Sequence, residues 1–238
     1  MNKRGQITIF MIIGVLIVSA IFSLLIFNSL KNGSISNKQL YPEIQEIQDS
    51  MESCVNERAI DAVRLIGFNG GHITIPKENI NTEIGRISYG YLKGENILPN
   101  KQEIENEISS YIKESLPFCL NESRFSDKKI TFQNTNAKTK IEDFILIETT
   151  TPISLIENEQ AITSDMTIAV TIELNFNKIL ETSNKIVESQ KNTKEYVSVN
   201  TLAGLDKDVY FDFIDENNVL FIISDDNTKL NDIKYTFA

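Results

Sequence analysis

The sequence predicts an α+β domain with a mainly antiparallel sheet and amphipathic helices, preceded by one N-terminal transmembrane helix. Three observations lead to this fold class. An uncharged run covers residues 7–27, apolar positions then recur at the spacing of a helix, and from Lys129 onward they recur at every second residue. The 238 residues, 41% hydrophobic and 24% charged, suffice for one or two globular domains and exclude a collagen-like or fully disordered chain.

The transmembrane prediction depends on the run Ile7–Phe27. Its 21 residues carry no charge, and a helix of that length spans about 30 Å of hydrocarbon. A removable secretory signal has a shorter apolar run of about 7 to 15 residues, so we expect this segment to be retained. Lys3 and Arg4 precede it and favour the cytoplasm for residues 1–6. We therefore expect a single-pass protein of the cell membrane whose C-terminal domain faces outwards.

The charge distribution separates this N-terminal region from the rest of the chain. Residues 1–38 contain four basic and no acidic residues, which leaves 19 basic and 33 acidic residues, a net charge of −14, for residues 39–238. Residues 28–38 are polar and form the predicted linker. An acidic exported domain argues against nucleic acid as a partner, because phosphate binding needs clustered Lys and Arg.

The exported part divides into two predicted regions: a helix–hairpin–helix unit over residues 39–120 and an antiparallel α+β domain over residues 121–238. In the first region we expect a helix from near Tyr41 to Gly67, a strand at 72–75 paired with one at 87–92, and a helix from Lys101 that Pro117 ends. In the second we expect strands at 130–132, 141–147, 166–174 and 235–237, a helix at 176–190, and a hairpin of 209–213 with 219–223.

The N-terminal segment Lys3-Arg4-Gly5-Gln6, followed directly by the apolar run, resembles the class III signal of archaeal type IV pilins and archaellins. The resemblance implies cleavage between Gly5 and Gln6, with the apolar helix kept as anchor or filament core. That family usually has Glu at the fifth mature position, where this chain has Phe10. The alternative is an uncleaved signal anchor.

Later segments are similar to a group of archaeal single-pass membrane proteins of comparable length. The similar pieces are Ser53-Cys54, the run 67–73, the segment 116–120 and the run 186–190. This likeness implies an anchored, exported domain and no particular activity.

The two cysteines, Cys54 and Cys119, lie on the two predicted helices of the first region. Packing these helices side by side would bring the thiols within bonding reach, and export permits oxidation. We therefore expect a disulfide, worth roughly 4 kcal/mol on the chain-entropy model. The alternative is a pair of buried free thiols.

Residue types for catalysis or metal binding do not form a recognisable motif in the sequence. His72 is the only histidine, and its position after Gly70-Gly71 is typical of a turn. A zinc site built mainly from imidazoles would need more than one histidine, and the clustered aspartates lack EF-hand spacing. We therefore assign no catalytic residue, no metal site and no cofactor.

Two Asn-X-Ser patterns, at Asn32 and Asn121, match the acceptor of N-glycosylation. The expected export makes both positions eligible for modification.

The function class that fits these observations is an extracytoplasmic envelope protein, anchored in the lipid bilayer through residues 7–27. We expect a non-catalytic binding or assembly role, with a protein partner or self-association. One alternative is a type IV pilin-like filament subunit processed after Gly5. A second is a membrane-tethered hydrolase that uses carboxylates, which any two of the 33 acidic residues could supply.

Overall fold

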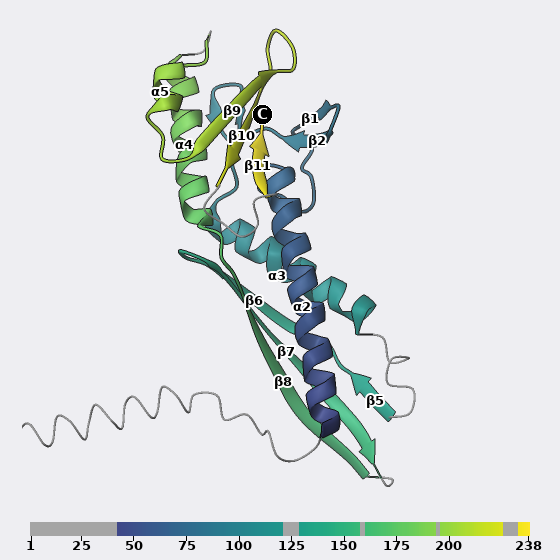
Figure 1. Ribbon diagram of the computed structural model, residues 1–238. Helices are drawn as coiled ribbons and strands as arrows, with labels where there is room; N and C mark the ends of the chain where they lie inside the picture. The colour runs from purple at the N-terminus through teal and green to yellow at the C-terminus, as the bar shows by residue number, and fades with distance from the viewer. Residues whose placement is uncertain (1–41, 121–128, 158–159, 194–195, 226–232) are drawn as a thin grey trace, which may run out of the picture. The chain divides into compact units, whose positions relative to one another are not determined.

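The computed structural model of the chain describes residues 42–120, 129–157, 160–193, 196–225 and 233–238 (Figure 1). Within these ranges every strand pair is antiparallel, which confirms the predicted α+β class with antiparallel sheets. Ile47–Ala238 forms one compact unit. The expected span at 7–27 lies outside the described residues, and no helix inside them is both long and apolar enough to cross a membrane.

The first described helix, α2 (Pro42–Phe68), buries the apolar stripe that predicted it. It does not end at Gly67 as expected. The helix continues to Phe68, and Gly70 and Gly71, with φ of 76° and 94°, then turn the chain away. Gly67 has a packing role instead, because a Cβ atom there would lie 2.6 Å from the backbone oxygen of Lys234.

The second helix, α3 (Lys101–Cys119), begins at a reciprocal cap. The Asn100 side chain accepts the backbone N–H of Glu103, and the Glu103 carboxylate accepts that of Asn100. Pro117 was expected to end this helix but lies inside its last turn. There it removes one backbone donor close to the helix end, which disturbs fewer turns than a proline at mid-helix.

The larger sheet contains four strands: β5 (Lys129–Phe132), β6 (Asn136–Ile141), β7 (Ile145–Glu157) and β8 (Gln160–Ile172). β7 is central. It pairs with β8 along its whole length, while β5 and β6 share its other edge. The expected strand through 141–147 is therefore two strands, separated by a turn in which the Glu142 N–H donates to the Phe144 backbone oxygen.

One face of this sheet is buried and the other is wet, as the alternation of apolar and polar residues predicts. Ile145, Ile147 and Ile153 are buried, and their neighbours in sequence are more exposed. α3 packs on β6, where the Ile141 N–H donates to Glu105 Oε1 at 2.8 Å. Elements from both sides of residue 120, the expected boundary between the two regions, thus lie together in one compact unit.

The smaller sheet has the order β11-β10-β9, and the helix that contacts its strand β10 is followed by a second, short helix. Its strands are β9 (Asp208–Phe213), β10 (Val219–Ser224) and β11 (Lys234–Phe237), and the helices are α4 (Phe176–Asn192) and α5 (Val199–Ala203). The expected hairpin is confirmed, with Phe213 opposite Val219 and Phe211 opposite Phe221. α4 is held at its start by the Asn175 side chain, which accepts the Lys178 N–H. The short α5 was not expected.

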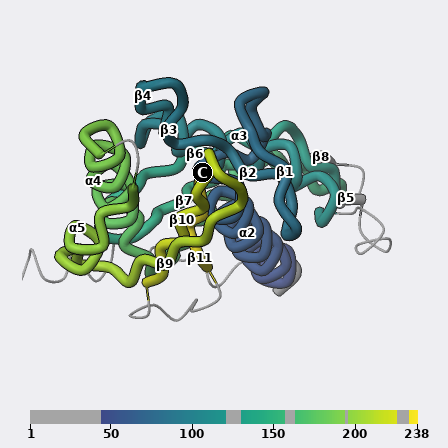
Figure 2. The backbone as a smooth tube through the Cα atoms, turned by 90° about the horizontal axis from the view of Figure 1, so that it is seen from above, coloured from purple at the N-terminus to yellow at the C-terminus, as the bar shows by residue number. Residues whose placement is uncertain are grey.

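The chain between α2 and α3 forms two small hairpins: β1 (Asn79–Thr82) with β2 (Gly85–Ser88), and β3 (Tyr91–Leu92) with β4 (Glu95–Asn96). The expected strand at 72–75 was wrong. Its backbone N–H groups at Ile73 and Thr74 donate to the Glu107 carboxylate of α3 and are not available for a partner strand. Figure 2 shows β3 and β4 beside α4.

Candidate functional site

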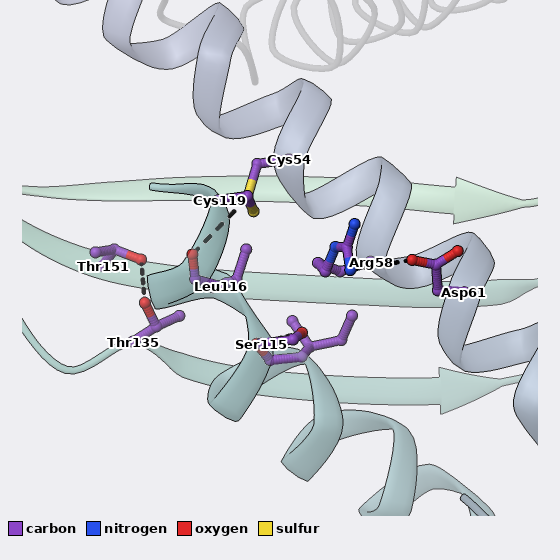
Figure 3. The surroundings of a disulfide bond; sticks show 9 residues. Cys54, Arg58, Asp61, Ser115, Leu116, Cys119, Thr135 and Thr151 are labelled. Atoms are coloured by element: carbon purple, nitrogen blue, oxygen red, sulfur yellow. Dashed lines mark hydrogen bonds and ion pairs between the residues drawn. A yellow bond between two sulfur atoms is a disulfide. The ribbon is translucent and has the colours of Figure 1, made fainter. Parts of the chain in front are cut away.

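The disulfide predicted between Cys54 and Cys119 is formed in the structure, with Cα atoms 6.0 Å apart. Figure 3 shows how it joins the middle of α2 to the last turn of α3 over the strands of the larger sheet. The residues around the bridge indicate a structural role. Cys54 is buried, and Arg58 pairs with Asp61 one turn further along α2. The sequence contains no third cysteine that could exchange with the bridge. The disulfide therefore acts as a staple between two helices.

The other sequence-predicted positions lie outside the described residues. These are Gly5 and Gln6 of the cleavage pattern and the two glycosylation candidates Asn32 and Asn121. No group of three or more His, Cys, Asp or Glu side chains suited to a metal ion occurs in the ranges that the structure describes.

His72 belongs to a small clamp that sequence reasoning did not find. Its Nδ1 atom lies 3.0 Å from Glu107 Oε1, and the other carboxylate oxygen accepts the N–H groups of Ile73 and Thr74. Burial alone would raise the pKa of Glu107, but the hydrogen bonds from His72 and from the two backbone groups outweigh it and hold that pKa below its ordinary value. The clamp fixes the turn that follows α2. We assign no chemistry to it.

The feature best suited to function is a surface groove of about 400 Å³, which we call the aromatic groove. It lies among the end of α4, the β9–β10 hairpin, and the segments around Tyr89 and the C-terminal end of β11. Its lining consists of Tyr89, Tyr91, Ile186, Val187, Gln190, Tyr196, Val197, Phe213, Glu216, Asn217, Asn218, Val219, Phe221, Phe237 and Ala238. Six of these fifteen residues are tyrosine or phenylalanine, a composition typical of binding surfaces.

The phenylalanines that line the groove belong to a continuous series of ring contacts. Phe213 meets Phe211 edge to face at 5.8 Å, Phe211 meets Phe221 at 6.5 Å, and Phe221 stacks on Phe237 at 5.5 Å. The series then continues through Tyr235 into the core. Because each ring packs against the next, the exposed end of the series is held by the buried end. Such a series loses little conformational entropy on binding.

Two aromatic side chains stand out at the mouth of the groove. Phe213 and Tyr196 are each 63% exposed, whereas Phe221 and Phe237 in the floor are buried. Tyr210, 59% exposed, lies on the opposite face of β9 from Phe213, since successive side chains of a strand point to opposite faces. Exposed rings that continue a buried apolar floor mark a binding surface more strongly than scattered ones.

The rim of the groove is fixed by the turn between β9 and β10. The Asp215 carboxylate accepts the Asn217 N–H at 2.8 Å and the Asn218 side-chain amide at the same distance. These hydrogen bonds, led by that from the Asn217 backbone, hold the pKa of Asp215 below its ordinary value. The turn therefore presents Glu216 and Asn217 at the rim in a defined conformation.

The tyrosines on the other wall depend on Gly90. A Cβ atom at Gly90 would lie 2.6 Å from the Phe237 ring and 2.8 Å from Leu98, so only glycine lets this segment pass so close to β11. The Gly90 N–H donates to the Ala238 backbone oxygen at 2.7 Å and fixes that approach. Tyr89 and Tyr91, on either side of Gly90, are thereby both brought into the lining.

The smaller sheet also contains a buried ion pair. Lys207 Nζ lies 2.6 Å from Asp225 Oδ1, with only 8% and 2% of the two side chains exposed. The pair links the segment before β9 to the residue after β10. Its burial indicates a structural role, because a buried charge is tolerated only with a partner.

Comparisons with protein-family models, with curated proteins and with solved structures find no match for the chain. The similarity of its N-terminal segment to archaeal pilins therefore stays a prediction. Function has to be argued from the aromatic groove itself, which sequence reasoning missed. The alternation of Tyr89 and Tyr91 around Gly90 was one available signal, whereas Tyr196 stands in a segment without periodicity and gave none.

Proposed function

We propose that this chain is a membrane-tethered, extracytoplasmic binding protein whose contact surface is the aromatic groove. One observation carries the proposal: a rigid series of packed rings ends in the widely exposed Phe213, at the mouth of a groove that the equally exposed Tyr196 also lines. Monomeric proteins rarely leave large rings exposed over a preformed groove unless something binds there.

The tether and the outward orientation are supported by the sequence. The uncharged run 7–27 has the length of a membrane span, and the basic residues before it favour a cytoplasmic N-terminus. The disulfide between Cys54 and Cys119 agrees with export, because such bonds persist in oxidising compartments. A protein partner or a second copy would meet the groove outside the membrane.

A non-catalytic role fits the chemistry of the groove. Among the described residues that line it, Glu216 is the one with a carboxylate side chain, and hydrolysis by a pair of side-chain carboxylates needs two. The polar groups there, apart from the tyrosine hydroxyls, are the amides of Gln190, Asn217 and Asn218, which are suited to fixing the orientation of a ligand.

Site-specific photo-crosslinking in cells that produce the chain tests the proposal. p-Benzoylphenylalanine replaces Tyr196 in one variant and Tyr210, equally exposed but on the other face of β9, in the control. We expect a discrete adduct upon irradiation from position 196 and none from position 210. No adduct from position 196, or the same adduct from both positions, would contradict binding through the groove.

The pilin-like alternative retains one specific observation in its favour, the segment Lys3-Arg4-Gly5-Gln6 before the apolar run. In that case residues 7–27 would form a filament core and the acidic domain would be displayed along it. The state of the N-terminus separates the two alternatives.

A further inference from the structure

We propose that the aromatic groove binds a basic segment of a partner polypeptide by receiving a lysine or arginine side chain against its rings. The inference rests on the proposed function and deepens it, since it names the chemical class of the ligand. It starts from the charge of the lining. Glu216 is the only lining residue in the described part of the chain with a charged side chain, and the lining contains no lysine, arginine or histidine.

The rings supply the first part of the recognition. An ammonium or guanidinium group within about 6 Å of an aromatic face is attracted by the ring quadrupole. Tyrosines and phenylalanines line the groove from three directions: Tyr89 and Tyr91 before and within β3, Tyr196 after α4, and Phe213 at the end of β9. The methylene stem of the same lysine or arginine would pack on the apolar surface of these rings.

The carboxylate supplies the second part. Glu216 stands exposed at the rim, next to the Asp215 turn that fixes its backbone. The lysine nearest to the groove along α4, Lys191, does not compete for it, because its Nζ lies 3.0 Å from Glu188 Oε1. Among the described lining residues, an acidic ligand would meet a carboxylate and no cation. A basic ligand finds the Glu216 carboxylate beside the rings.

The charge of the whole exported part favours the same ligand. Residues 39–238 carry a net charge of −14, so a basic partner is attracted over a distance and an acidic one is repelled. The size of the groove, about 400 Å³, suits one or two side chains of a peptide rather than a folded surface.

Calorimetric titration of the full-length chain in nanodiscs of phosphatidylcholine tests this ligand class. The probes are four blocked octapeptides, identical except at three positions, which carry lysine, trimethyllysine, glutamine or glutamate, and an N-acetylglucosamine hexamer. We expect the lysine peptide to bind at least tenfold more tightly than the glutamine peptide, and the glutamate peptide not to bind. Trimethyllysine removes the hydrogen-bond donors but keeps the charge, so it should bind at least as well as lysine.

Matched variants locate the binding. Tyr196→Ala and Phe213→Ala should each weaken the lysine peptide about threefold, the loss expected for one exposed cation–π contact. Tyr210→Ala, of similar exposure on the opposite face, should leave the affinity unchanged. Glu216→Gln should weaken binding and reduce its dependence on salt, and Asp212→Asn, an exposed acid on β9, should change neither.

Three results would overturn the inference: equal affinity for the lysine and glutamine peptides, loss of lysine-peptide affinity in Tyr210→Ala as large as in Phe213→Ala, or binding of the N-acetylglucosamine hexamer in place of the peptides. The crosslink from position 196 does not depend on the ligand class. A crosslink without lysine-peptide binding therefore contradicts this inference alone, and the absence of a crosslink contradicts the proposed function.

Discussion

Glu107 decides the path of the chain between α2 and β1. Its carboxylate accepts the N–H groups of Ile73 and Thr74 and lies 3.0 Å from His72 Nδ1, so one side chain of α3 satisfies three groups of the turn. A charged acceptor makes these bonds stronger than those between neutral groups. The turn depends on a contact over more than 30 residues, which a local reading of the sequence does not contain.

Glu107→Gln should destabilise the chain by about 1–2 kcal/mol at pH 6, because the amide loses the charge and one acceptor. The pKa of Glu107 is held below its ordinary value of 4.5. Its stabilising contribution is therefore complete above that value and is lost as the pH falls through the lower pKa of the folded state. Urea unfolding in steps from pH 6 to pH 3 measures this.

The difference between the wild type and Glu107→Gln should shrink below pH 4.5. The control is Glu114→Gln, an exposed glutamate of the same helix, which should stay within about 0.5 kcal/mol of the wild type throughout. A difference for Glu107→Gln that persists unchanged to pH 3 would show that the lost interactions do not depend on the carboxylate charge.

Phe213 shows what sequence patterns predict at the scale of a residue and what they do not. The alternation of Val209, Phe211 and Phe213 placed them on one face of a hairpin, and the register confirms it. The pattern says nothing of what covers that face. Phe211 has neighbours over it, and Phe213, two residues on, is 63% exposed at the groove. Exposure depends on where other elements end, which is a property of the tertiary structure.

At the scale of elements, prediction succeeded where the sequence has a long apolar stripe at helical spacing or a clean alternation of apolar and polar residues. α2, α3, α4 and the hairpin of β9 with β10 were all expected close to their observed bounds. It failed for short elements whose hydrogen bonds come from elsewhere. In the segment 72–75, the N–H groups of Ile73 and Thr74 donate to the Glu107 carboxylate and not to a neighbouring strand. The five-residue α5 is too short to show a helical period in its sequence.

The disulfide is the element-scale prediction with the largest expected effect on stability. Cys54 and Cys119 are separated by 65 residues, so the bridge restricts the unfolded chain by about 4 kcal/mol on the chain-entropy model. Reduction should lower the free energy of unfolding by roughly that amount, measured by urea titration with and without reductant. The double variant Cys54→Ala/Cys119→Ala should show no response to reductant. Wild-type stability that is indifferent to reductant would mean that the bridge contributes nothing.

The buried pair of Lys207 and Asp225 holds the ends of two strands of the smaller sheet together. Lys207→Met should destabilise the chain by about 3 kcal/mol, because it removes the ammonium group that pairs with the buried Asp225 carboxylate. Lys191→Met is a matched control, since Lys191 pairs with Glu188 at the surface and such pairs contribute about 0.5 kcal/mol. Chemical unfolding of both variants makes the comparison. Equal effects would show that the burial of the Lys207 pair does not matter.

At the scale of the molecule, two features point to one division of labour. The N-terminal region carries all its charge as Lys and Arg around an apolar run, and residues 39–238 carry the acidic excess and a rigid aromatic groove. A tether needs no specific surface beyond its length and apolar character. A binding domain needs a preformed one, and in the described residues the packed rings of the groove supply a candidate.

The state of the N-terminus decides whether the proposed tether is a simple anchor. A filament core would require cleavage after Gly5 and a helix that continues out of the membrane, yet residue 10 is phenylalanine where the resembling family usually has glutamate, and the polar segment 28–38 follows the span. We therefore expect intact-mass spectrometry of the chain from its own membrane to show a start at Met1 or Asn2. Substitution Gly5→Val should then leave the mass changed only by the substitution itself. A start at Gln6 in the wild type, abolished by that substitution, would instead establish processing of the pilin kind. In a filament built from such subunits, the proposed basic partner would meet many copies of the aromatic groove at once.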